Sequence, residues 1–144
     1  MARKLLVGAG LLVALMLSSS ARADFVLVKQ SKNTTARLTK DAAKSVFSGR
    51  TKTWSNGNVI ILVIGSEDSP AMQWLAPTFF GVSAKTYLTK IKQDVFKGDV
   101  RHPLSADDDA NTLKRIASTP GVVGWVNDRT ANSLPVGFAI LPVD

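Results

Sequence analysis

A loop that follows an apolar run carries the groups that could bind an anion. Residues 59–64 are all apolar and lead into Gly65-Ser-Glu-Asp-Ser-Pro-Ala71. A serine placed directly before Pro70 predicts the first turn of a helix, whose N–H groups have no partner within the helix and whose dipole favours negative charge. The candidate ligand groups for phosphate or a related oxyanion are the hydroxyls of Ser66 and Ser69 and the N–H groups of Ala71 and Met72.

The same loop also has a purely structural interpretation. Serine is a favoured N-cap, so Ser69 could simply close the first turn of the helix. Glu67 and Asp68 lie in the loop and would each repel a phosphate dianion by roughly 1 kcal/mol, about the net worth of one hydrogen bond. The residues alone leave both interpretations open.

Positive charge gathers between residues 29 and 52. This stretch contains seven basic residues and one acidic residue, Asp41. The formal net charge of the whole chain is +7. Such a stretch either steers an anion or an acidic partner, or is an ordinary solvated surface. The residues that we select for partner binding or anion steering are Lys40, Lys44, Arg50 and Lys52.

Several other chemistries are excluded by composition. The chain has no cysteine and a single histidine, His102, so no common zinc site and no nucleophile–base pair is evident, and we expect neither a catalytic residue nor a cofactor. Asp107–Asp109 lacks the spaced ligands of a calcium loop and fits a helix N-terminus better. Basic and aromatic residues do not alternate as in nucleic-acid-binding proteins.

The pattern of strands and helices predicts one small α/β domain. Its sheet should be mostly parallel or mixed and flanked by helices, because the strands are separated by helices. We expect strands at 25–28, 59–64, 122–126 and 137–141. Helices should begin after Thr39, Ser69, Ser83 and Ser105, where Ser105–Asp108 resembles a capping box with Asp in place of Glu. They should end near Gly49, Gly81, Gly98 and Pro120.

Residues 1–23 are typical of a secretory signal peptide. Arg3 and Lys4 precede an apolar run at 5–17, and Ala21-Arg-Ala23 provides a small-x-small cleavage sequence. The run is shorter than the roughly 20 residues that a membrane-spanning helix needs. We therefore expect export to the periplasm, a domain at 24–144, and no membrane span after cleavage.

Three segments resemble the phosphate-binding proteins of ABC importers, which are type II periplasmic binding proteins. The first runs from Leu38 to Trp54 and contains a helix, a glycine-basic turn and a tryptophan. The second is the strand at 59–64 with the loop to Ala71, and the third is Thr119-Pro-Gly-Val-Val-Gly-Trp-Val126. This resemblance covers nearly all of residues 24–144, but it corresponds to one lobe of a two-lobed family.

The resemblance implies a lobe whose ligand cleft would lack its second wall. The loop that in the family typically reads Arg-Ser-Asp-Gly-Ser-Gly-Thr keeps Ser66 and Ser69 here, but Gly65 stands in place of the arginine and Ala71 in place of the threonine. Our first hypothesis is weak periplasmic binding of phosphate or a similar oxyanion, with a second chain or a second copy as the missing lobe. The alternative is a non-catalytic interaction module that holds an ABC permease or another envelope protein.

Overall fold

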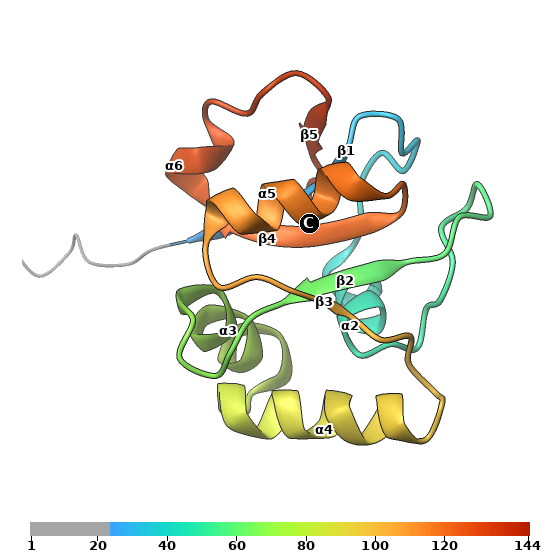
Figure 1. The fold of residues 1–144 in the computed structure, drawn as a ribbon, viewed down its shortest axis with the longest axis vertical. Helices are drawn as coiled ribbons and strands as arrows, with labels where there is room; N and C mark the ends of the chain where they lie inside the picture. The colour runs from blue at the N-terminus through green and yellow to red at the C-terminus, as the bar shows by residue number, and fades with distance from the viewer. Residues whose placement is uncertain (1–23) are drawn as a thin grey trace, which may run out of the picture.

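The computed structural model describes residues 24–144, which form a five-stranded mixed sheet with helices on both faces (Figure 1). The strands are β1 (Phe25–Gln30), β2 (Ile61–Ile64), β3 (Leu104–Ser105), β4 (Val122–Asn127) and β5 (Phe138–Ile140), in the spatial order β3-β2-β4-β1-β5. β2 is parallel to β3 and β4, whereas β1 is antiparallel to β4 and β5. The proposed signal peptide lies outside the described residues.

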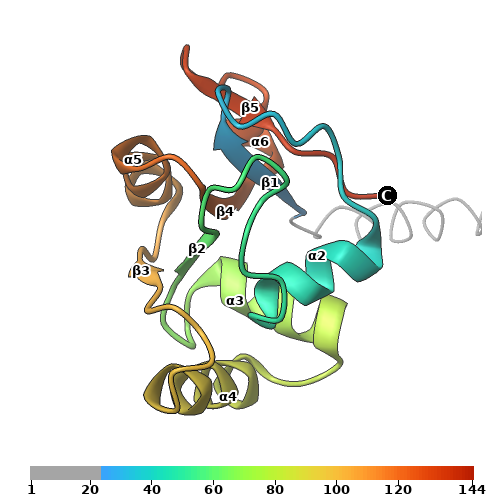
Figure 2. The ribbon, with the colours of Figure 1, turned by 90° about the vertical axis from the view of Figure 1, so that its right-hand side faces the viewer.

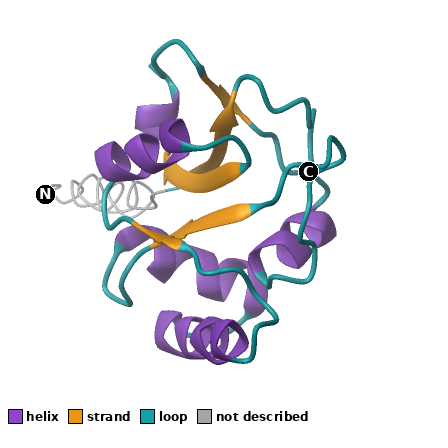
Figure 3. Ribbon diagram, turned by 45° about the vertical axis from the view of Figure 1, so that its right-hand side comes forward, coloured by secondary structure: helices purple, strands orange, loops and turns teal. Residues whose placement is uncertain are grey.

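Two layers of helices enclose the sheet. The helices are α2 (Lys40–Phe47), α3 (Pro70–Leu75), which continues as the π-helical segment η1 (Ala76–Phe80), α4 (Ala84–Phe96), α5 (Asp109–Ser118) and α6 (Asp128–Ala131). Figures 2 and 3 show α2, α3 and α4 on one face and α5 on the other. Among residues 24–144, no helix is long and apolar enough to cross a bilayer.

Side chains alternate in direction along each strand, so the core has one part on each face of the sheet. Neighbouring residues of a strand point to opposite sides of the sheet, so each strand supplies both layers. Leu27, Leu62, Val123 and Trp125 pack under α2, α3 and α4, whereas Val28, Val63, Val122 and Val126 pack with Ile116 of α5. The aromatic rings of Phe47, Trp74 and Phe79 lie 5.0–5.4 Å from that of Trp125. Trp125 therefore joins α2, α3 and η1 to the centre of the sheet.

Three of the predicted helix starts are confirmed. The side chains of Thr39, Ser69 and Ser83 each accept a hydrogen bond from the N–H three residues later, as an N-cap does. The fourth prediction is wrong: α5 is capped by Asp108, whose carboxylate accepts from the N–H of Asn111 at 2.8 Å. Ser105 instead belongs to β3, because its segment pairs with β2.

The strand predicted at 59–64 is shorter in the structure. β2 begins at Ile61, and Val59 is 39% exposed, so the first two residues of the predicted strand lie outside the regular strand. The first part of the run instead lies beside Gly121, whose φ of +92° brings its backbone against the Val59 carbonyl. β3 and α6 are too short to have given a periodic signal in the sequence.

Candidate functional site

The loop after β2 is tied together by its own hydrogen bonds. Asp107, from the loop between β3 and α5, accepts a hydrogen bond from the Ser66 N–H with an N···Oδ1 distance of 2.7 Å. The Ser69 hydroxyl donates to the Ser66 carbonyl at 2.9 Å and accepts from the Met72 N–H at 3.4 Å. The Ser69 hydroxyl and the Met72 N–H, two of the four groups that were predicted to meet an anion, therefore already have protein partners. At Ser66 the bonded group is the backbone N–H and not the predicted hydroxyl.

Packing closes the loop further. Ser69 is 4% exposed, and Ala71 is half-buried in the first turn of α3. A Cβ built on Gly65 would approach the Ser69 hydroxyl oxygen to 2.5 Å and the Ala106 carbonyl to 2.8 Å. An arginine, which the resemblance places at this position, would not fit without a shift of the backbone.

Acidic residues surround this loop at one end of the sheet. β2, β3 and β4 are parallel, so the loops that follow them meet at the same edge, and β1 begins there because it is antiparallel to β4. Seven of the 11 acidic residues of the chain lie at this edge, in the loops after β2 and β3, at the first residues of α5 and α6, or directly before β1. We call them the acidic edge: Asp24, Glu67, Asp68, Asp107, Asp108, Asp109 and Asp128.

Hydrogen bonds confirm that the acidic edge is one continuous surface. Asp107 reaches the loop after β2, Asp109 accepts from the Asn127 N–H at 3.1 Å, and the Asp128 N–H donates to the Asp24 carbonyl at 3.0 Å. Within residues 24–144, none of its members forms an ion pair with a basic side chain. Its negative potential opposes the binding of an oxyanion at this end of the sheet. The signal present in the sequence is that acidic residues follow the predicted strands at 59–64 and 122–126; the strand order and direction that bring them together come from the fold.

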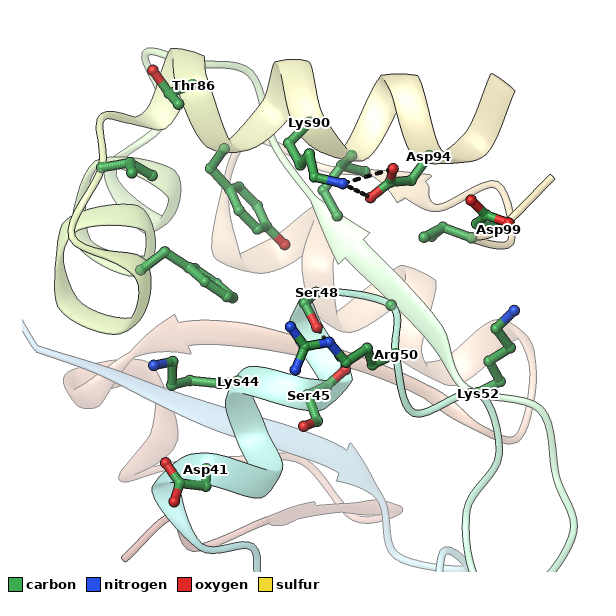
Figure 4. A pocket seen from close by; sticks show the side chains of 16 residues that line it. Asp41, Lys44, Ser45, Ser48, Arg50, Lys52, Thr86, Lys90, Asp94 and Asp99 are labelled. Atoms are coloured by element: carbon green, nitrogen blue, oxygen red, sulfur yellow. Dashed lines mark hydrogen bonds and ion pairs between the residues drawn. The ribbon is translucent and has the colours of Figure 1, made fainter. Parts of the chain in front are cut away.

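The basic residues that we selected lie at a groove on another part of the fold. Lys44, Arg50 and Lys52 line an open cavity of about 920 Å³ between α2 and α4. In Figure 4, Arg50 extends into the space between the helices, and Lys44 and Lys52 lie toward its two ends. We call this cavity, with these three residues, the basic groove. The fourth selected residue, Lys40, lies outside it, with its ammonium group 5.9 Å from the centre of the Phe79 ring.

The basic groove has an apolar part opposite α2. The buried side chains of Tyr87 and Ile91, from α4, and of Val100, which follows α4, belong to its lining. The Tyr87 hydroxyl donates to the Phe47 carbonyl at 2.6 Å, and burial raises the pKa of this tyrosine. Lys90 contacts both carboxylate oxygens of Asp94 at 2.8 Å, which neutralises that buried acid.

The charge balance of the groove is positive after this pairing. Asp41 and Asp99 are the remaining acids in the lining, against Lys44, Arg50 and Lys52. These three basic residues are exposed and form no ion pair with the described part of the chain. The groove can therefore offer an apolar wall and cationic groups to the same partner.

Metal and acid–base chemistry find no support in residues 24–144. No cluster of three or more potential metal ligands exists among them. His102 is exposed, and its Nδ1 lies 3.0 Å from the Pro103 carbonyl oxygen. Among the described residues, no hydrogen bond joins His102 to the loop after β2.

The fold defines the class: a single α/β domain that matches one lobe of the phosphate-binding proteins. The PstS protein from Borrelia burgdorferi is 13% identical, with a TM-score of 0.63 over 85% of this chain and 47% of its own. A protein from Clostridium perfringens with bound phosphate, described as a phosphate ABC transporter substrate-binding protein, is 15% identical, with a TM-score of 0.64 over 85% of this chain and 45% of its own. A phosphate-binding protein from Stenotrophomonas maltophilia gives 14% identity and a TM-score of 0.59 over 85% and 39%.

Sequence comparison adds nothing to this structural similarity. No protein-family model matches the chain, and no curated protein matches it. The chain spans less than half the length of the solved structures that it matches. Those structures are binding proteins, and at this identity the similarity concerns the fold.

Proposed function

We propose that this protein is an exported, non-catalytic lobe that docks an acidic partner in the bacterial envelope through its basic groove. The observation that supports it is the separation of the two candidate sites. In the loop before α3, the Ser66 N–H is bonded to Asp107 and acids lie around it, whereas Lys44, Arg50 and Lys52 form no ion pair in the described part of the chain and line an open cavity. The partner would be an ABC permease or another envelope protein, met after the signal at 1–23 has directed export.

Electrostatics suits the groove to docking. Lys44, Arg50 and Lys52 outnumber Asp41 and Asp99 in the lining, so the groove attracts an acidic surface over roughly one Debye length, about 8 Å at physiological salt. Contact with the apolar wall then buries apolar area. Charge complementarity of this kind mainly accelerates and orients association. The function needs no cofactor, metal or nucleic acid.

Binding of a labelled polyglutamate peptide, followed by fluorescence anisotropy at low salt, tests the docking function. The groove variant Lys44→Glu/Arg50→Glu replaces attraction with repulsion at two positions. At roughly 1 kcal/mol per exposed charge pair, the expected loss of affinity is about tenfold or more.

A matched control separates the groove from net charge. The variant Lys85→Glu/Lys92→Glu changes the same amount of charge on the exposed side of α4, outside the groove. It should weaken peptide binding by less than about threefold, because distant exposed charges are screened. Equal losses in the two variants would refute a specific role for the groove.

Weak binding of phosphate or a similar oxyanion is the second candidate function. It is favoured by the similarity to structures of phosphate-binding proteins, one of which holds phosphate. Its site would be the groups of Ser66, Ser69, Ala71 and Met72, after Asp107 has moved away from the Ser66 N–H. A calorimetric titration of phosphate and sulfate tests it, and absence of heat at millimolar ligand rejects it.

A further inference from the structure

We infer that the acidic partner of the basic groove is a second copy of this chain, which presents its acidic edge. This inference rests on the proposed function, because it takes the groove as a docking site and names its occupant. The molecule carries both halves of a complementary pair, and they are built from different residues.

The acidic edge is exposed and almost free of positive charge. Of its seven members only Asp109 is half-buried, and its carboxylate is held by the Asn127 N–H and the Thr130 hydroxyl. In the loops 65–69, 106–109 and 127–129, Arg129 is the single basic residue. Glu67 and Asp68 are exposed at this surface, and no hydrogen bond among the described residues uses their carboxylates.

The two surfaces lie at different ends of the strands. The acidic edge consists of loops that follow β2, β3 and β4, whereas Arg50 and Lys52 of the groove precede β2, and Asp99 and Val100 precede β3. Because β2 and β3 are parallel, loops before them and loops after them are separated by the length of the strands. One copy therefore cannot place its own edge in its own groove.

This arrangement determines the symmetry of association. A contact between two different surfaces is heterologous, so each copy could offer its edge to one neighbour and its groove to another. The contact is polar and exposed, and it should weaken steeply as salt is raised.

Sedimentation equilibrium of the intact protein over a range of concentration and ionic strength tests the inference. At low salt the weight-average mass should rise with concentration above that of one chain. At high salt it should return to one chain. A mass of one chain at every low-salt concentration would overturn the inference.

Two charge-reversal variants give the sharper test. The groove variant Lys44→Glu/Arg50→Glu and the edge variant Glu67→Lys/Asp68→Lys should each be monomeric, because each lacks one half of the pair. Mixed in equal amounts, they should associate again, because the intact edge of the first variant meets the intact groove of the second, and the reversed groove and reversed edge also carry opposite charges. Circular dichroism checks that both variants are folded.

The outcomes separate this inference from the proposed function. If polyglutamate binds in a groove-dependent way but the protein stays monomeric, the second copy is excluded and docking of another acidic partner stands. If neither binding nor association occurs, both are overturned. Association that both variants leave unchanged, or a mixture that stays monomeric, would also overturn the self-docking.

Discussion

Replacement of Asp107 with asparagine tests whether the charge of Asp107 opposes anion binding at the loop after β2. The Asp107 carboxylate lies 2.7 Å from the Ser66 backbone nitrogen, within this loop. Asparagine keeps an oxygen that can accept this hydrogen bond but removes the negative charge. The loop should therefore keep its conformation while its repulsion of anions falls.

The expected gain in affinity follows from Coulomb's law. A phosphate dianion about 5 Å from a carboxylate in water-like dielectric is repelled by ~1–2 kcal/mol. Removal of that repulsion corresponds to an affinity increase of about five- to thirtyfold. If the loop is an oxyanion site, phosphate should bind Asp107→Asn more tightly than the wild-type protein by this factor.

Isothermal titration calorimetry with phosphate provides the assay. The variant Asp99→Asn is the control, because it makes the same change of net charge at the groove. Equal phosphate affinity in the wild-type protein and Asp107→Asn would refute the argument that Asp107 competes with the anion. No heat from either protein at millimolar phosphate would exclude the loop as an oxyanion site and favour docking as the function.

Three further predictions concern the core. Tyr87 is the single tyrosine and its pKa is raised from 10.0 by burial, so the unfolded chain ionises first. The free energy of unfolding should then fall as pH rises above 10. A spectrophotometric tyrosinate titration combined with urea unfolding measures this fall, and the Tyr87→Phe variant should lack the part of it that comes from tyrosine ionisation. Trp54→Phe removes an indole hydrogen bond of 3.0 Å to the Gly121 carbonyl and should lower the free energy of unfolding, measured with urea, by about 1–3 kcal/mol. Trp125→Phe removes an indole N–H that has no partner among the described residues and should lower it by less. Gly121→Ala should lower the thermal unfolding midpoint, because its φ is +92° and its Cβ would come within 2.2 Å of the Val59 carbonyl; an unchanged midpoint would refute this packing.

Helix starts could be predicted from the sequence where the capping residue lies within a few residues of the N–H that it bonds. Thr39, Ser69 and Ser83 cap helices as predicted, because an N-cap bonds to an N–H only three residues away. The N-cap predicted at Ser105 was wrong, because this residue pairs with Ile64 of β2 and belongs to a strand. A partner 41 residues earlier in the chain thus overrode a local capping pattern.

The candidate sites depended on contacts that no spacing in the sequence specifies. The sequence indicated that Ser66 and Ser69 stand before a helix, but the approach of Asp107 joins two loops 41 residues apart. It also indicated an excess of positive charge between residues 29 and 52, but not that α4 would face it across a cavity.

The amino-acid sequence by itself determined an α/β domain, the starts of most of its helices and the sign of its charged segments. These follow from side-chain periodicity, capping and composition, which act over a few residues. Tertiary structure alone decided that the acids meet at one edge while Lys44 and Arg50 flank a groove with α4. The reason is topological: strand order and direction determine which loops become neighbours, and that order is established by packing between distant parts of the chain.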